Sequence, residues 1–492
     1  MTSRICNTVV GIIEILVVAI CAVGCQDKGS VTIENISAGK TADNNPLRVC
    51  IHFSCSNAER AYVEYWVNGE DKILVSPVSV VSSNTAVLED SGVVTAASAK
   101  AVNCRIVLTR LQFKSDYRYR VVLVTGGREI KSDVYPFRTQ DVPDQFEGLY
   151  HVNEVGNMDL PAGFKMGSML VYNRLTPGFI GLLDYKGRLR WCQTIKNTGV
   201  KVAHFTQNKT ILSILAPMDY PTSYGNEMLE LSLTGDTVFH LKKGEKDFQQ
   251  TIHHEILLNA KNQYVTLYAD ERVLDLSPAG GGKADTVRGD GILVLDRSGK
   301  KVWGWSVFDE LDPLRERNII KEEKDWMHAN SLFIDADGNY LISFYNNGQI
   351  WKIDASTKKV VWKFGRGGDF KIPPDASFDQ GHAVHINAQH KLMLFDNGGS
   401  KQRSRALVFD LNERGRQASV SLCVQLQQGV FTDRMGSAYM VDDRSILTCI
   451  SKQNMVLLAG INGEVLWRMT CANTPYRVEF IPFDKSMPYI GE

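Results

Sequence analysis

The stretch GNYLISFYNNGQIWKIDASTKKVVW, residues 338–362, sets the pattern for most of the chain. An apolar strand core, YLISFY, is followed by a turn rich in Asn and Gly and then by two strands joined at Asp, Ser and Thr. Short strands bounded by such turn residues predict an antiparallel unit. One unit of this kind cannot bury both of its faces, so it must stack against further copies.

Related hairpins recur at intervals of about 50 residues, a period typical of repeat architectures. They read GLLDYKGRLRW (181–191), LELSLTGDTVFHL (229–241), GILVLDRSGKKVWGW (291–305), IWKIDASTKKVVW (350–362), ALVFDLNERGR (406–416) and VLLAGINGEVLW (456–467). The pattern predicts an all-β fold with a six-bladed β-propeller over residues 148–492. A seven-bladed ring, closed with the help of TPYRVEFIPF (474–483), is the alternative.

The chain before the repeats has a different pattern. Residues 28–140 contain short alternating segments such as AYVEYWVNG (61–69) and CRIVLTRL (104–111), which predict a β-sandwich. The stretch LTRLQFKSDYRYRVVLV (108–124) resembles the late strands of a fibronectin type III module. Within the repeats, residues 309–324 form the best helix candidate, which we expect to be a loop insertion over the mouth of the channel.

The N-terminus has the features of an export signal. Residues 9–24 are apolar apart from Glu14 and follow the single positive charge of Arg4. The tetrapeptide AVGC (22–25) resembles a bacterial lipobox, which implies that residues 1–25 are a lipoprotein signal peptide and that Cys25 is lipidated. We therefore expect an exported protein, periplasmic or at the cell surface, anchored to the bacterial membrane through lipid. An ordinary signal peptide that happens to contain a cysteine is the alternative.

Composition narrows the partners. The 55 Lys and Arg residues balance 55 Asp and Glu residues with no long basic run, so no nucleic-acid partner is expected. Seven of the ten cysteines follow Cys25, an odd number without CxxC spacing, so disulfide pairing stays open. The sequence also leaves a homodimer open.

Five of the ten histidines fall at the start of consecutive inner strands: His253, His254, His328, His382 and His385. These strand starts converge at one end of a propeller axis, so the sequence predicts a histidine site at one mouth of the channel. Three imidazoles from neighbouring strands could also complete a zinc or iron site. Glu255 is the one carboxylate next to them, and alternation would point it away from His254.

Several segments around these histidines resemble the signature blades of the bacterial arylsulfate sulfotransferases. They are HHEI (253–256), DWMHANS (325–331), ADGNYLIS (336–343), IWKID (350–354), QGHAVHI (380–386) and LFDNGG (394–399). The resemblance implies an enzyme that moves a sulfuryl group from a phenolic sulfate ester to a phenol without nucleotide or metal cofactor. It implies two displacements, with a histidine carrying the group between them.

The resemblance also implies roles for individual residues. The spacing to Asp396 and Asn397 matches the family's nucleophile at His382, not at His385. His254, with His253 less favoured, and His328 and Asn330 match positions that hold sulfate oxygens or handle the phenolic proton. Fixed donors of this kind stabilise negative charge in the transition state.

One family position differs. Tyr345 stands where the family has an arginine, so a guanidinium for the sulfate would have to come from Arg366 or Arg405. A binding propeller that is anchored at the surface and has no enzymatic activity is the competing function, and the common register of the histidines argues against it.

Overall fold

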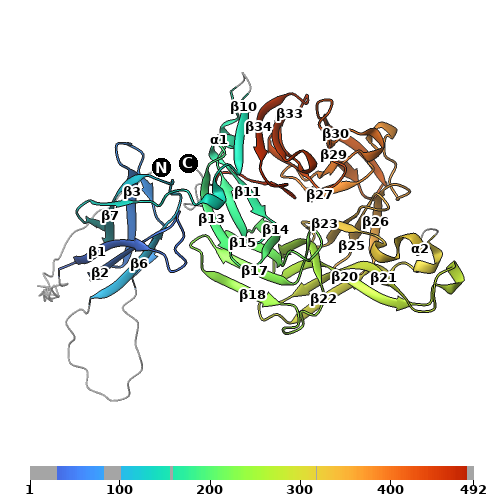
Figure 1. Cartoon of the computed structure of the whole chain (residues 1–492), viewed down its shortest axis with the longest axis horizontal. Helices are drawn as coiled ribbons and strands as arrows, with labels where there is room; N and C mark the ends of the chain where they lie inside the picture. Colours follow the sequence, from blue (N-terminus) through green and yellow to red (C-terminus); the bar gives the residue numbers. More distant parts are fainter. Residues whose placement is uncertain (1–29, 82–100, 156–158, 317–318, 485–492) are drawn as a thin grey trace, which may run out of the picture.

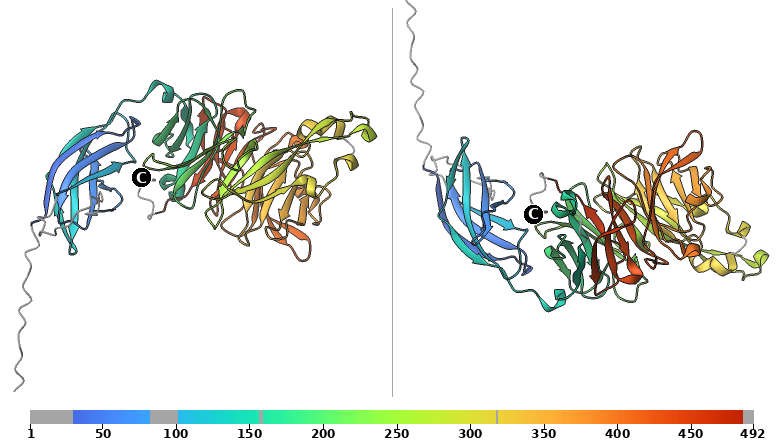
Figure 2. Two further views of the ribbon diagram at one scale, coloured as in Figure 1. Left: turned by 90° about the horizontal axis from the view of Figure 1, so that it is seen from below. Right: turned by 90° about the horizontal axis from the view of Figure 1, so that it is seen from above.

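The computed structural model describes residues 30–81, 101–155, 159–316 and 319–484 (Figure 1). The signal segment and Cys25 lie outside these residues. The described chain is almost entirely β-structure, which confirms the predicted all-β class. A smaller N-terminal part is followed by a larger ring of sheets, and the two lie side by side along the long axis of the molecule (Figures 1 and 2).

The N-terminal part consists of two antiparallel sheets. One contains β1 (Thr32–Lys40), β2 (Val49–Ser56) and β6 (Val102–Leu108); the other contains β3 (Arg60–Val67), β4 (Leu74–Val75), β5 (Ser79–Val80), β7 (Asp116–Thr125), β8 (Arg128–Lys131) and β9 (Tyr135–Arg138). In β7 the residues Tyr117, Tyr119 and Val121 are buried and alternate with more exposed arginines, so one face of the sheet meets the core.

The larger part has six antiparallel sheets among the described residues. In chain order, and from the inner strand outward, they are β35 (Glu479–Ile481), β11 (Ser168–Asn173), β12 (Gly178–Leu183) and β13 (Leu189–Ile195); β14 (Gly199–Phe205), β15 (Thr210–Ala216), β17 (Glu227–Ser232) and β18 (Thr237–Lys242); β19 (Ile252–Leu258), β20 (Tyr264–Leu274), β21 (Asp285–Leu295) and β22 (Lys301–Ser306), with β16 (Tyr224–Gly225) beside β19; β23 (Ala329–Ile334), β24 (Tyr340–Phe344), β25 (Gln349–Ile353) and β26 (Val360–Gly365); β27 (Gly381–Ile386), β28 (Leu392–Asp396), β29 (Arg405–Asn412) and β30 (Gln417–Gln425); and β31 (Ser437–Asp442), β32 (Ser445–Ile450), β33 (Met455–Gly460), β34 (Val465–Cys471) and β10 (Tyr150–Val155).

Both ends of this part close the ring. β10, at its start, is the outermost strand of the last sheet, and β35, at its end, is the innermost strand of the first sheet. The inner strands of successive sheets contact one another from β14 through β19, β23, β27 and β31 to β35. The sheets therefore follow one another in colour order from green to red around a central axis (Figure 1).

Helices are short. They are α1 (Ala162–Met166) and α2 (Ile319–Glu322), with 3₁₀ turns at Asp144–Phe146, Ser277–Ala279, Val307–Asp309, Pro313–Arg315, Glu323–Asp325, Pro374–Ala376, Gly399–Lys401 and Ser451–Gln453. The expected insertion at 309–324 is thus a chain of single turns that leads directly into β23. No helix in the described ranges is long and apolar enough to cross a membrane.

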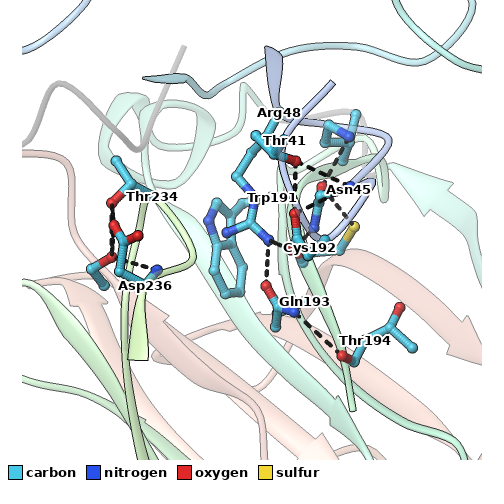
Figure 3. Close-up of polar contacts among 12 residues, drawn as sticks. Thr41, Asn45, Arg48, Trp191, Cys192, Gln193, Thr194, Thr234 and Asp236 are labelled. Carbon is cyan, nitrogen blue, oxygen red and sulfur yellow. Dashed lines mark hydrogen bonds and ion pairs between the residues drawn. The ribbon is translucent and has the colours of Figure 1, made fainter. Parts of the chain in front are cut away.

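The two parts meet through specific polar contacts (Figure 3). Asn45 donates from Nδ2 to the carbonyl oxygen of Cys192 over 2.6 Å, and the buried guanidinium of Arg48 donates to Gln193. Arg48 also lies 5.7 Å from the ring centroid of Trp191. These contacts join the first sheet of the ring to the loop between β1 and β2, so the connection is more than a tether.

Candidate functional site

The inner strands carry irregularities where the histidines lie. The pairing of β19 with β20 shifts between His253 and Ile256, and that of β27 with β28 shifts between His382 and His385. His254 and His328 have φ values of 58° and 55°, in the left-handed region that residues other than glycine rarely adopt. Such strain is retained only where the surrounding structure enforces it, and it gathers at functional sites.

These irregularities bring the predicted histidines together. The ring centroids of His254 and His328 are 5.2 Å apart. The ring of Tyr345 lies between the other pair, 5.3 Å from His328 and 5.6 Å from His382. Three neighbouring sheets therefore supply one continuous cluster. We call the end of the ring where β14, β19, β23 and β27 begin the histidine face.

His382 is buried and its tautomer is fixed by Asn397. Nδ1 of His382 lies 2.5 Å from Oδ1 of Asn397. The amide nitrogen of Asn397 donates to the carbonyl oxygens of Thr432 and Met435, each over 2.9 Å, so Oδ1 must accept from the imidazole. The proton of neutral His382 is therefore on Nδ1, and the lone pair is on Nε2. Burial, with the nearby positive charge of Arg477, lowers the pKa of His382 to about 3.

His328 has the opposite character. Its Nδ1 lies 2.5 Å from Oδ2 of Asp325, the last residue of the insertion. Burial lowers the pKa of His328, but the hydrogen bond and charge of Asp325 outweigh burial, so the pKa is raised overall. The same pair lowers the pKa of Asp325 although burial opposes this. His328 can therefore hold a proton near neutral pH while the more deeply buried His382 stays neutral.

His253 and His254 form a neutral pair. Their Nδ1 atoms are 2.8 Å apart, so one ring donates and the other accepts. Burial lowers the pKa of His253 to about 3 and that of His254 well below its usual value. Nε2 of His253 lies 3.3 Å from Asp290, and burial raises the pKa of that carboxyl to about 7. His253 stacks on Tyr224 behind His254, so His254 is the member of the pair beside His328.

A buried ion pair supports Asn330. Arg477 donates from Nη1 to Glu255 over 2.6 Å and from Nη2 to the main-chain oxygen of Asn330 over 2.5 Å. Burial lowers the pKa of Arg477, but Glu255 outweighs burial and the pKa is raised. Glu255 also pairs with His204, so its charge is shared. Nδ2 of Asn330 is buried without a hydrogen-bond partner among the described residues, which leaves this donor free for a ligand.

Neither proposed replacement arginine joins the cluster. Arg405 is buried, donates to Asp396 over 2.9 Å, and also binds the carbonyl oxygens of Asp375 and Ser377. Arg366 is exposed and lies 3.9 Å from Asp379. The expectation that one of them supplies the guanidinium is therefore corrected: their donors hold loops, and the guanidinium among the histidines is that of Arg477.

Tyr345 and His385 are placed differently from one another. Tyr345 donates from its hydroxyl to the carbonyl oxygen of Asp433 over 3.1 Å, so its ring is held as a wall between His328 and His382. His385 lies beyond the β27 irregularity, where it stacks on Tyr439 with a centroid distance of 5.1 Å. The structure thus separates the two histidines of GHAVHI, as the resemblance implied.

Four functional residues escaped sequence reasoning. Asp325 and Asn397 were visible in the quoted motifs, and a search for partners of each histidine would have singled them out. Asp290 and Arg477 are distant in sequence, and only the closed ring brings them to the site. Among the described residues, no group of three His, Cys, Asp or Glu side chains has an arrangement that could hold a metal ion.

Comparison with known proteins gives a family match. The profile of the family described as Arylsulfotransferase (ASST) matches residues 139–427, more than half of the chain. No curated protein matches. Similar solved structures include a protein of unknown function from Bacteroides caccae, at 10% identity and a TM-score of 0.41, covering 64% of this chain and 99% of that one. An auxiliary nutrient binding protein from Bacteroides thetaiotaomicron, at 10% identity and a TM-score of 0.33, covers 93% of this chain and 92% of that one.

Proposed function

Because the chain belongs to the arylsulfotransferase family, we propose that it is an arylsulfate sulfotransferase that acts through a sulfohistidine at His382. The donor is a phenolic sulfate ester and the acceptor is a second phenol. The observation that carries the proposal is the tautomer of His382, whose Nε2 lone pair is fixed by Asn397 in a buried, uncharged ring. A positioned neutral imidazole is a competent nucleophile near neutral pH.

In the first displacement, Nε2 of His382 attacks sulfur and the bond from sulfur to the aryl oxygen breaks. The electron pair of that bond goes to the phenolic oxygen, which takes a proton from His328. In the second displacement, His328 takes the proton of the acceptor phenol, whose oxygen attacks sulfur. The nitrogen–sulfur bond then breaks, and its electron pair returns to Nε2. Protons and charges balance over the cycle.

The remaining groups stabilise charge. The unpartnered Nδ2 of Asn330 and the ring of His254 are the donors we assign to the sulfate oxygens. Arg477 contributes positive potential and holds the backbone at Asn330, since both of its terminal nitrogens are already engaged. Preorganised donors of this kind account for a large part of catalysis in acyl and phosphoryl transfer, and sulfuryl transfer makes the same demand.

The proposal extends to the whole molecule. We assign the ring to the six-bladed β-propellers, with residues 148–492 as the catalytic domain, and residues 28–140 to the fibronectin III-like sandwiches. We also propose that residues 1–25 are a lipoprotein signal peptide and that lipid on Cys25 anchors the exported protein to the membrane. Loss of membrane-fraction recovery in Cys25→Ser, with the protein still exported, tests the anchor.

The nucleophile is tested by single turnover. Incubation with p-nitrophenyl sulfate and no acceptor should release about one equivalent of p-nitrophenol and add sulfonate mass to the peptide that contains His382. His382→Asn should abolish both signals. His385→Asn is the matched control and should retain both, because His385 stacks on Tyr439 away from the cluster. A full burst from His382→Asn would assign the nucleophile elsewhere.

A further inference from the structure

A second pocket opens on the histidine face, outside the cluster described above. It measures about 380 Å³ and is lined in part by Arg174, Leu175, Lys201, Met218 and Tyr220. Arg174 follows β11, and Lys201 lies near the start of β14. The second strand of an antiparallel sheet ends where its first strand begins, so the loops after β11 and β15 both lie on the histidine face.

The pocket is cationic and has no counterion in its wall. No Asp or Glu occurs among the described residues that line it. Burial and the charge of Arg174 lower the pKa of Lys201, and Asp219, which lies outside the lining, opposes them only in part. Burial lowers the pKa of Arg174 as well. Two neighbouring cations that have lost water and face one cavity favour an anion.

Both cations have donors to spare. The ammonium group of Lys201 has no hydrogen bond or ion pair within the described part of the chain. Arg174 makes one long bond of 3.4 Å, from Nη2 to the carbonyl oxygen of Thr474, and its buried Nε has no partner there. A guanidinium and an ammonium together suit a carboxylate or sulfate, which accepts several charge-assisted hydrogen bonds.

The other walls suit an aromatic body. Met218 and Leu175 are exposed apolar side chains at the rim, and Tyr220 adds a ring. Tyr476 lies between this pocket and the histidines: its ring centroid is 6.1 Å from that of His254, and its phenol is close enough to Arg174 for their charges to interact. One wall thus separates the reacting groups from the cationic pocket.

We propose that this pocket binds the distal anionic group of an aryl substrate, so that phenols carrying a second carboxylate or sulfate are the favoured acceptors. The inference rests on the proposed function for its use in turnover. A mostly apolar pocket with a few convergent charged groups is the usual form of a small-molecule site.

A matched pair of acceptors tests the inference. With p-nitrophenyl sulfate as donor, 4′-hydroxybiphenyl-4-carboxylate should show a higher kcat/KM than neutral 4-hydroxybiphenyl. Lys201→Met and Arg174→Gln should each lower kcat/KM for the carboxylate about 10-fold to 100-fold, the usual worth of a hydrogen bond to a charged group, and leave the neutral acceptor unchanged. Lys300→Met, which removes an exposed charge from an outer turn, is the control.

Calorimetry separates this inference from the proposed function. Tighter binding of the carboxylate than of the neutral phenol, lost in Lys201→Met and kept in Lys300→Met, supports the pocket even if no sulfuryl transfer is detected. Equal affinity of the wild-type protein for both compounds, or a preference that survives in both pocket variants, would overturn it whether or not the protein is a sulfotransferase.

Discussion

At the scale of single residues, the environment of each imidazole decides its role. His382 and His328 face the same cluster, yet one is bonded to a neutral amide and the other to a carboxylate. The amide leaves His382 uncharged with a free Nε2, whereas the carboxylate keeps a proton on His328. Two histidines with diverging pKa values are the arrangement expected for a nucleophile next to a general acid.

Asn397→Ala should separate the tautomer from the imidazole itself. The change removes the acceptor for Nδ1, so both tautomers of His382 become populated and its ring is no longer held. We expect the burst of p-nitrophenol to slow on the order of 10²–10⁴-fold, the scale of losing a catalytic tautomer. Rapid-quench measurement at saturating p-nitrophenyl sulfate checks this.

The same change leaves the buried carbonyl oxygens of Thr432 and Met435 without a donor, which should lower the free energy of unfolding by about 1–3 kcal/mol. The rates must therefore be compared well below the melting temperature of Asn397→Ala. A burst as fast as that of the unchanged protein would contradict the tautomer argument.

At the scale of elements, irregular backbone positions the site. Strand alternation alone would turn successive side chains to opposite faces, but the shift in β19 and the left-handed residues interrupt that rule. The insertion after β22 then delivers Asp325 to His328 through four consecutive short turns. The functional part of the insertion is its last residue.

Asp325→Asn should therefore move the pH profile. His328 must be protonated to act as the acid, so the burst rate falls as pH rises through its pKa, which Asp325 raises. Without the carboxylate that pKa drops, and the descending limb should shift to lower pH.

The leaving group provides the control for this shift. Phenyl sulfate, which releases a basic phenolate, should lose more rate in Asp325→Asn at neutral pH than p-nitrophenyl sulfate, which needs little protonation. Equal losses for both esters, with an unmoved pH profile, would mean that His328 is not the acid.

At the scale of the whole molecule, closure of the ring and assembly of the site are the same event. Arg477 lies two residues before β35, the strand that completes the first sheet. The guanidinium can reach Glu255 and Asn330 only when β35 is in place. Activity should therefore depend on closure more steeply than stability does.

Phe480→Ala tests this link. Phe480 is a buried residue of β35 and packs near Phe164, so its loss should cost about 3–5 kcal/mol of the free energy of unfolding. Phe409→Ala, in the core between the fourth and fifth sheets, should cost a similar amount. We expect the burst to be several-fold slower in Phe480→Ala than in Phe409→Ala when both are measured in the folded range. Equal rates would show that closure and the site are independent.

The sequence by itself determined the class of fold, the recurring sheets and three of the histidines that meet. Period and alternation are local signals, and strands at one register must start at one end of a ring. The matching motifs also distinguished His382 from His385, which the structure places in different surroundings.

Only the tertiary structure decided the partners of those histidines. Arg477 lies 147 residues from Asn330 along the chain, and no local pattern records a contact over that separation. The mistaken choice of Arg405 has the same origin. Its neighbours Asp396, Asp375 and Ser377 bind it only because β28 pairs with β29 and the loop before β27 folds over them. Burial and pairing set the charge and direction of a side chain, and both arise only when distant segments pack together.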